Sequence, residues 1–107
     1  MADEEKTIYI AGQITDNVHF MQDFETAEKK LKARGYTKII NPTCLSNLKL
    51  DYEQFMIITL SMVEAADVIY LLRNWKNSKG AAREYQYALV QDKDIMFEAD
   101  EDYKDFD

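Results

Sequence analysis

The 107-residue sequence is poor in the residues that carry metal and disulfide chemistry. It contains one cysteine, one histidine and one proline, with three glycines. A lone Cys44 forms no intramolecular disulfide, so we expect a reducing, cytoplasmic setting. His19 and Cys44 belong to no cluster with metal-ligand spacing, so no metal site is predicted. Cys44 also has no histidine that the sequence places beside it, which argues against a cysteine nucleophile.

Long apolar runs are also missing. None approaches 18 residues, so no membrane span is expected. The segment Met1–Glu5 is acidic and lacks the basic start and apolar stretch of a signal peptide. Hydrophobic residues make up 47% and charged residues 31%, which is typical of a folded globule. The length predicts one domain over 1–107.

Positive charge is in deficit, and the deficit lies at the ends of the chain. The formal net charge of −7 comes from residues 1–6 and from the acidic segment 98–107, while residues 7–97 are neutral. This balance argues against binding to long nucleic acids or to anionic membranes. We expect 98–107 to be a solvated tail. The alternative is an interaction tail, in which Tyr103 and Phe106 dock on the body or on a neighbouring subunit.

Strand and helix patterns alternate through the body of the chain. Short runs rich in β-branched residues predict strands, and apolar residues at helical spacing predict helices. The segment 43–50 is expected to be a loop. The order βαβαβαβ predicts an α/β fold with a parallel sheet and right-handed crossovers. The expected strands lie within 7–11, 36–41, 67–72 and 93–97, and the expected helices run from Asp16 or Asn17 to Gly35, from Asp51 to Ala66 and over 78–91.

Residues near the helix ends support these boundaries. Asp51 and Gln54 have the spacing of a capping box, and Gly35 suits the left-handed position after a helix. The apolar stripe of the second helix is expected to be Tyr52, Phe55, Met56, Leu60, Val63 and Ala66.

Open α/β sheets bind ligands at the carboxyl ends of their strands, which directs attention to four segments. These are Ala11–Gln13, Asn41–Pro42, Leu72–Ser78 and the start of the third helix. Gly12 would let a ligand approach the backbone closely. A single glycine there is neither a dinucleotide-binding fingerprint nor a P-loop.

The segment Ser78-Lys-Gly-Ala-Ala-Arg-Glu84 is the strongest candidate for chemistry. Ser78 is a plausible helix N-cap, and Gly80 exposes backbone N–H groups in the first turn. Glu84 lies beside an apolar stripe and could point into a site at the sheet edge. The alternative is a glutamate on the helix surface.

Four cations, Arg73, Lys76, Lys79 and Arg83, follow the third strand with no acid between them. Cations in the first turns of a helix cost about 0.3–1 kcal/mol each, which suggests an anionic ligand nearby. The alternative is a surface that only improves solubility. Trp75, in the same loop, could stack on a base or a sugar, or could cover the core.

Taken together, Tyr9–Gly12, Asn41-Pro42, Ala66–Ile69 and Ser78–Glu84 resemble the nucleoside 2-deoxyribosyltransferase superfamily, in particular its small DUF4406-type branch. The resemblance covers about Lys6 to Phe97. It implies a flavodoxin-like three-layer fold and a homodimer or larger oligomer. It also implies chemistry at the N-glycosidic bond of a small nucleoside or nucleotide, with no cofactor.

The resemblance also implies roles for individual residues. Glu84 would attack the anomeric carbon of the sugar, and Tyr9 would position it. The four cations would suit a nucleoside 5′-monophosphate. The expected substrate-binding residues are Gly12, Gln13, Asn41, Thr59, Trp75, Ser78 and Gly80.

Two departures from the family pattern leave the activity open. The family has a catalytic aspartate eight residues before the aspartate that opens the third strand, and this chain has Thr59 there. Gln13 stands where a proline or serine commonly follows the glycine. Three hypotheses follow: an N-glycosidase or deoxyribosyltransferase, a nucleotide-binding module without turnover, and a structural or partner-binding protein that uses the acidic tail.

Overall fold

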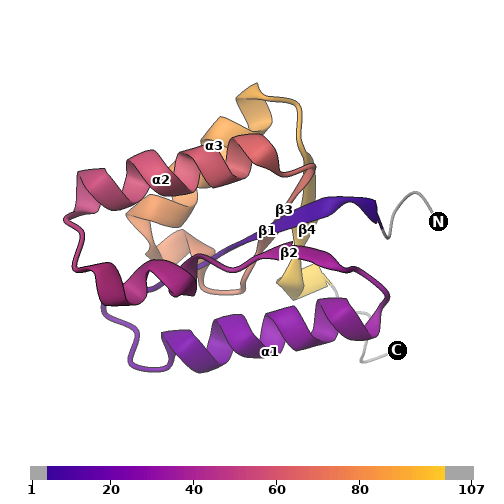
Figure 1. Cartoon of the computed structure of the whole chain (residues 1–107), viewed down its shortest axis with the longest axis horizontal. Helices are drawn as coiled ribbons and strands as arrows, with labels where there is room; N and C mark the ends of the chain where they lie inside the picture. Colours follow the sequence, from indigo (N-terminus) through magenta and orange to yellow (C-terminus); the bar gives the residue numbers. More distant parts are fainter. Residues whose placement is uncertain (1–4, 101–107) are drawn as a thin grey trace.

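The computed structural model describes residues 5–100 as a four-stranded parallel sheet between two layers of helices (Figure 1). The strands are β1 (Thr7–Ala11), β2 (Lys38–Ile40), β3 (Val68–Leu71) and β4 (Asp94–Phe97). The helices are α1 (Phe20–Ala33), α2 (Tyr52–Ala65) and α3 (Lys79–Val90), with the short 3₁₀ helices η2 (Pro42–Leu48) and η3 (Trp75–Asn77). Helix α1 covers one face of the sheet, and α2 and α3 cover the other (Figure 1). The predicted three-layer α/β fold is confirmed.

The strand order is β2-β1-β3-β4, and all three pairings are parallel. Tyr9 of β1 pairs with Ile40 on one side and Ile69 on the other, so β1 is a central strand. The chain builds the sheet outward from β1 in both directions, as in flavodoxin-like folds. The switch point of such a sheet, between β1 and β3, is where ligands bind.

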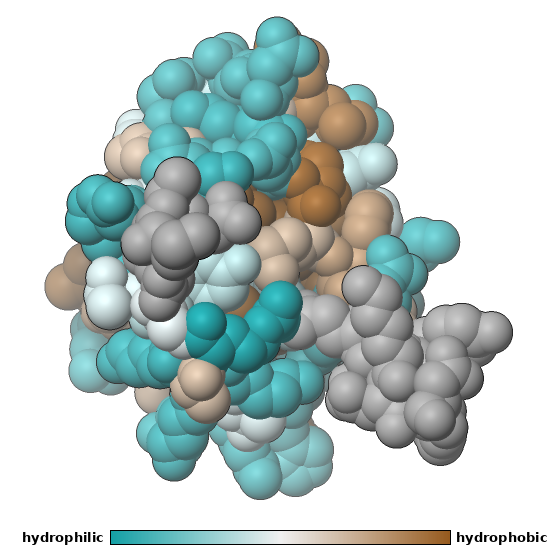
Figure 2. Space-filling model, turned by 90° about the vertical axis from the view of Figure 1, so that its right-hand side faces the viewer, coloured by the Kyte–Doolittle hydropathy of each residue, from teal (hydrophilic) through white to brown (hydrophobic). Residues whose placement is uncertain are grey.

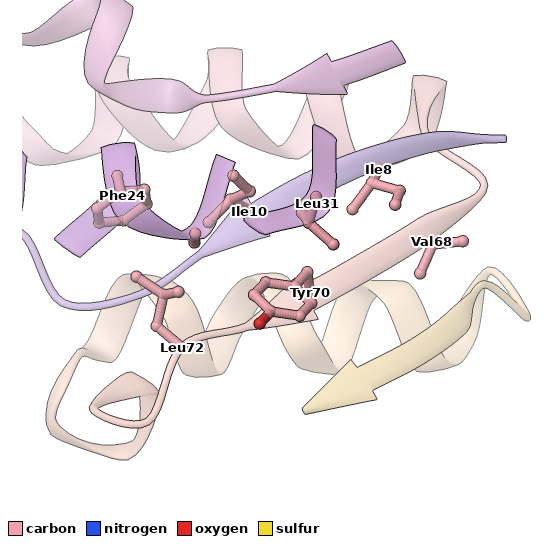
Figure 3. Close-up of a cluster of buried hydrophobic side chains, with 8 residues drawn as sticks. Ile8, Ile10, Phe24, Leu31, Val68, Tyr70 and Leu72 are labelled. Atoms are coloured by element: carbon pink, nitrogen blue, oxygen red, sulfur yellow. The ribbon is translucent and has the colours of Figure 1, made fainter. Parts of the chain in front are cut away.

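Alternation along β1 separates two hydrophobic clusters, because successive side chains of a strand point to opposite faces. Ile8 and Ile10 lie on the α1 side, while Tyr9 and Ala11 lie on the side of α2 and α3. The α1-side cluster is shown in Figure 3, with Ile8, Ile10, Phe24, Leu31, Val68, Tyr70 and Leu72 labelled. The phenol of Tyr9 is therefore directed toward the layer that contains α3.

Several predicted helix ends are confirmed. The Asp51 carboxylate accepts a hydrogen bond from Gln54 N at 2.8 Å, and Asp51 N donates to Gln54 Oε1 at 3.0 Å, which completes the capping box. Gly35 has φ 101°, a left-handed conformation that glycine adopts without strain. Ser78 caps α3 by accepting from Ala81 N at 3.0 Å.

The predicted start of the first helix is wrong. Helix α1 begins at Phe20 with His19 as N-cap, and neither Asp16 nor Asn17 caps it. Asn17 N donates to Ile14 O at 3.3 Å, which closes a turn, and Asp16 inside that turn has φ 62°. A left-handed residue cannot continue into a right-handed helix, so the helix starts later.

Two further expectations need correction. The segment expected to be a loop over 43–50 is largely the 3₁₀ helix η2, which Asn41 caps by accepting from Thr43 N at 3.0 Å. Glu98 is part of the folded body and not of a solvated tail. It accepts from Arg73 N at 2.9 Å and pairs with Lys30 at 3.4 Å. Residues 101–107, with Tyr103 and Phe106, lie outside the described residues.

The buried row of α2 also differs from the predicted stripe. It consists of Met56, Thr59 and Val63, while Tyr52 is 46% exposed. Ile57, outside that row, is 68% exposed. The sequence of α2 is apolar on more than one side, so periodicity alone does not identify the face that packs on the sheet.

The amino ends of the strands carry charged side chains. Lys6 pairs with Asp94 at 3.1 Å, and the Asp67 carboxylate accepts from Thr7 N at 2.8 Å. Figure 2 shows the side of the molecule on which these strand ends lie. It is mostly hydrophilic, with hydrophobic residues gathered in its upper right part. No helix within residues 5–100 has the length and apolar character that a bilayer crossing requires.

Candidate active site

A cavity of about 270 Å³ lies beyond the carboxyl ends of β1 and β3, at the switch point of the sheet. Most of its walls come from three parts of the chain, and Tyr9, Phe24 and Pro42 complete the lining. The first is Gly12 with residues 14–16, the second is the start of α2 at Tyr52, Phe55 and Met56, and the third is residues 77–81 with Glu84. The cavity is the size of a small molecule and not of a polymer.

Glu84 lines this cavity, and the residue is 4% exposed. Ala81, Glu84 and Ala88 form the buried row of α3, because their spacing of three and four residues places them on one face. Tyr9, which is fully buried, donates its phenolic hydrogen to Glu84 Oε2 at 2.8 Å. The alternative of a glutamate on the helix surface is therefore wrong.

Burial raises the pKa of the Glu84 carboxyl to about 7, although hydrogen bonds from Thr59 and Tyr9 act in the opposite direction. Desolvation disfavours the charged form of a carboxyl group, and hydrogen-bond donors favour it. The pKa of Tyr9 is raised well above its ordinary value by burial and then by the negative charge of Glu84. The Glu84 carboxyl thus titrates near neutral pH, while Tyr9 keeps its proton.

Thr59 of α2 lies behind this pair and is fully buried. Its hydroxyl group donates a hydrogen bond to the Met56 sulfur at 3.9 Å, and it lowers the pKa of the Glu84 carboxyl. Thr59 is not part of the cavity lining, so it contacts the carboxylate and not the space for a ligand. A hydroxyl group thus stands where the family resemblance implies a second carboxylate.

Three of the predicted substrate-binding residues line the cavity: Gly12, Ser78 and Gly80. Gly12 is buried, and a Cβ atom there would lie 2.6 Å from Leu72 Cδ1. At Gly80 the nearest atom to such a Cβ would be the Met56 sulfur at 3.3 Å. Both glycines allow close packing at the wall of the cavity.

Three other predicted residues lie outside the cavity lining: Gln13, Asn41 and Trp75. Gln13 donates its backbone N–H to Asn74 Oδ1 at 3.0 Å. The Asn41 amide group donates to Glu28 Oε1 at 3.0 Å. The Trp75 ring packs against Tyr85, with ring centroids 4.8 Å apart, and also against Phe97. The structure therefore supports the alternative in which Trp75 covers the core.

The four cations do not form one basic surface at the cavity. Lys79 lines it, but Arg73, Lys76 and Arg83 do not. Arg83 Nη1 lies 3.4 Å from Glu53 Oε2, and Lys76 Nζ lies 5.8 Å from the centre of the Trp75 ring. The positive charge that the sequence gathers in one segment is dispersed over the surface.

A family model described as "Domain of unknown function (DUF4406)" matches residues 6–97. The chain belongs to the DUF4406 family. A search of the curated proteins gave no match. Among solved structures, this DUF4406 protein is similar to a 2-desoxiribosyltransferase from Leishmania mexicana, with a TM-score of 0.66 and 23% sequence identity. The match covers 86% of this chain and 63% of the other, so the DUF4406 chain spans less than two thirds of that protein, and the similarity shows the fold.

Sequence reasoning missed part of the cavity of this DUF4406 protein. Ile14, Thr15 and Asp16 line it from the β1–α1 loop, whereas Pro42, which also lines it, belongs to the predicted segment Asn41–Pro42. The rule that ligands bind after the strands led to Gly12 and its neighbour, but the loop returns to the cavity two residues later. The sequence predicts Tyr52, Phe55 and Met56 in the apolar stripe of the second helix, because lining a pocket and packing a core require the same apolar residues.

Proposed function

We propose that this DUF4406 protein cleaves or transfers the N-glycosidic bond of a deoxynucleoside or of its 5′-monophosphate, with Glu84 as the nucleophile. The observation that carries the proposal is the buried Glu84 carboxyl group, which lines the cavity and accepts a hydrogen bond from Tyr9. The resemblance of Ser78–Glu84 and Tyr9–Gly12 to deoxyribosyltransferase motifs supports it.

In the proposed first step, the ionised Glu84 carboxylate attacks the anomeric carbon of the sugar. A C–O bond forms, the C–N bond breaks, and its electron pair leaves with the base. The product is a glycosyl ester on Glu84, formed through an oxocarbenium-like transition state as in retaining glycosidases. Water or a second base then attacks the same carbon and releases the carboxylate.

The chain's own residues have distinct parts in this step. Tyr9 holds one carboxylate oxygen, so that the other oxygen is available to the sugar. Thr59 lowers the pKa of the same carboxyl group and so favours its charged form. With a pKa of about 7, roughly half of the Glu84 side chains are ionised at neutral pH, and a desolvated carboxylate is more reactive than a hydrated one. No cofactor takes part in the proposed reaction.

Release of free base from a panel of deoxynucleosides and their monophosphates tests the proposal. We expect wild type to release base and Glu84→Gln to lose at least 100-fold in rate. Glu25→Gln is a matched control, since Glu25 is exposed on α1 and pairs with Lys29. Equal rates in wild type and Glu84→Gln would rule out Glu84 as the nucleophile.

A second function is a binding module without turnover, and the buried Thr59 favours it. A threonine cannot deliver a proton to the departing base at neutral pH, and such proton transfer contributes about 10²–10⁴-fold to rates. A binding module would show a raised melting temperature with a deoxynucleoside and no release of base. The predicted homo-oligomer and the predicted cytoplasmic location stay predictions.

A further inference from the structure

Asp16 is a second carboxylate at the cavity, on the β1–α1 loop. Its side chain is exposed and makes no hydrogen bond or ion pair within residues 5–100. An unpaired carboxylate can only accept hydrogen bonds, and it repels anions. Asp16 therefore contributes a negative charge to the rim of the cavity that no neighbour within residues 5–100 neutralises.

The backbone conformation of Asp16 is one that glycine or asparagine usually occupies. Asp16 has φ 62° at the third position of the turn that Asn17 N closes on Ile14 O. Glycine would adopt this conformation with less strain. Aspartate tolerates this conformation, but its side chain gains no hydrogen bond within residues 5–100, so no contact of the described chain accounts for the carboxylate.

Hydrogen bonds on both sides of Asp16 hold the loop in place. The Asn17 amide group donates to Gln13 O at 2.9 Å and to Asp23 Oδ2 at 3.1 Å. Gln13 N in turn donates to Asn74 Oδ1, which ties this loop to the one that follows β3. The carboxylate of Asp16 is thus held at the rim by contacts that do not involve its own side chain.

The residues that line the cavity have no excess of positive charge. Lys79 is the basic residue among the lining residues of the described chain, and Asp16 carries the opposite charge. The backbone N–H groups at the start of α3 attract an anion weakly. A phosphate group carries a charge of about −1.5 to −2 at neutral pH, so Asp16 would repel it, whereas it would not repel a neutral sugar.

We propose that Asp16 makes the cavity select an uncharged deoxynucleoside over its 5′-monophosphate. The carboxylate accepts a hydrogen bond from a hydroxyl group of the sugar and repels a phosphate in the same place. This inference rests on the proposed function, because it assumes that the cavity holds a deoxynucleoside or its monophosphate. It narrows that function to the neutral substrate, against the monophosphate that the four cations in the sequence suggested.

The test compares binding of a deoxynucleoside and of its 5′-monophosphate by calorimetry, in a Glu84→Gln background that prevents turnover. We expect the nucleoside to bind more tightly, and Asp16→Asn to improve the relative affinity for the monophosphate about tenfold. Asp92→Asn is the matched control. Asp92 also has a left-handed backbone, with φ 57°, and lies among Lys6, Asp67 and Asp94 at the amino ends of the strands.

Asp16→Gly separates selectivity from folding, because glycine relieves the strain of the turn. We expect a melting temperature equal to or above that of the background variant, together with the same change in selectivity. Tighter binding of the monophosphate with Asp16 present, a ratio that Asp16→Asn leaves unchanged, or no binding of either ligand would each overturn the proposal. The two proposals can fail separately. If Asp16→Asn changes the relative affinity for the two ligands but wild type releases no base, the proposed reaction is wrong and the role of Asp16 in selectivity still holds.

Discussion

The phenol of Tyr9 donates a 2.8 Å hydrogen bond to Glu84 Oε2, across 75 residues of sequence and between a central strand and a helix that covers it. Neither residue type is unusual by itself. The pair becomes distinctive because both side chains are buried and because the carboxyl group faces a cavity.

Removing the phenolic hydroxyl group should change how Glu84 titrates. In Tyr9→Phe the carboxylate loses a donor that stabilises its charged form, so we expect its pKa to rise above about 7. The lost hydrogen bond should also lower the free energy of unfolding by about 1–3 kcal/mol. Carboxyl-carbon NMR through a pH titration measures the first effect, and urea denaturation measures the second. Tyr85→Phe, in the cluster with Trp75, is the control, and an unchanged pKa in Tyr9→Phe would contradict the account.

The titration of Glu84 should make the free energy of unfolding depend on pH. Its pKa rises from an ordinary value of 4.5 to about 7 on folding, so the folded state holds this proton more tightly than the unfolded chain does. The native state is therefore destabilised as pH rises from about 4.5 to about 7, by roughly 3 kcal/mol at the upper end. Glu84→Gln lacks this titration.

Urea denaturation at a series of pH values measures that difference. The stability of Glu84→Gln relative to wild type should increase between pH 4.5 and pH 7 and stay constant above pH 8. A difference that is independent of pH would show that Glu84 does not titrate abnormally in the folded protein.

Replacing Thr59 tests whether the missing carboxylate limits the chemistry. Thr59→Asp places a second acidic group against Glu84 in a fully buried position, so we expect the protein to become less stable at high pH. If the mechanism needs a proton donor at this position, base release should rise by about 10²–10⁴-fold. Thr59→Asn, which is uncharged, is the control. A rate gain of the same size in Thr59→Asn would show that charge and proton transfer are not the cause.

The two cavity glycines should respond differently to a methyl group. In Gly12→Ala the new Cβ would lie 2.6 Å from Leu72 Cδ1 and 3.0 Å from Leu72 Cβ, so the backbone after β1 has to shift. We expect a loss of about 1–3 kcal/mol in the free energy of unfolding. In Gly80→Ala the nearest atom is the flexible Met56 sulfur at 3.3 Å, so a smaller effect or none is expected. Thermal unfolding of both variants makes the comparison, and equal losses would contradict it.

The sequence predicted those parts of the fold that depend on local chemistry. Alternating strand and helix patterns, the Asp51 capping box and the left-handed Gly35 follow from side chains within a few residues of one another. They are enough for an α/β fold with Glu84 near the carboxyl edge of a parallel sheet. The start of α1 was missed, because a turn around Asp16 competes with the capping potential of the same residues.

The composition of the cavity was decided by tertiary structure. Four cations that are close together in sequence lie apart in the structure, because η3 and the first turns of α3 point them in different directions. One of them, Arg83, pairs with Glu53 of α2. Conversely, Asp16 and Glu84 line one cavity although 68 positions separate them, because neighbouring parallel strands end at the same edge. The sequence by itself determined which elements form and which carboxylate is the candidate nucleophile. Only the packing of α2 and α3 on the sheet decided that Glu84 is desolvated, which residue holds it, and which charges face a ligand.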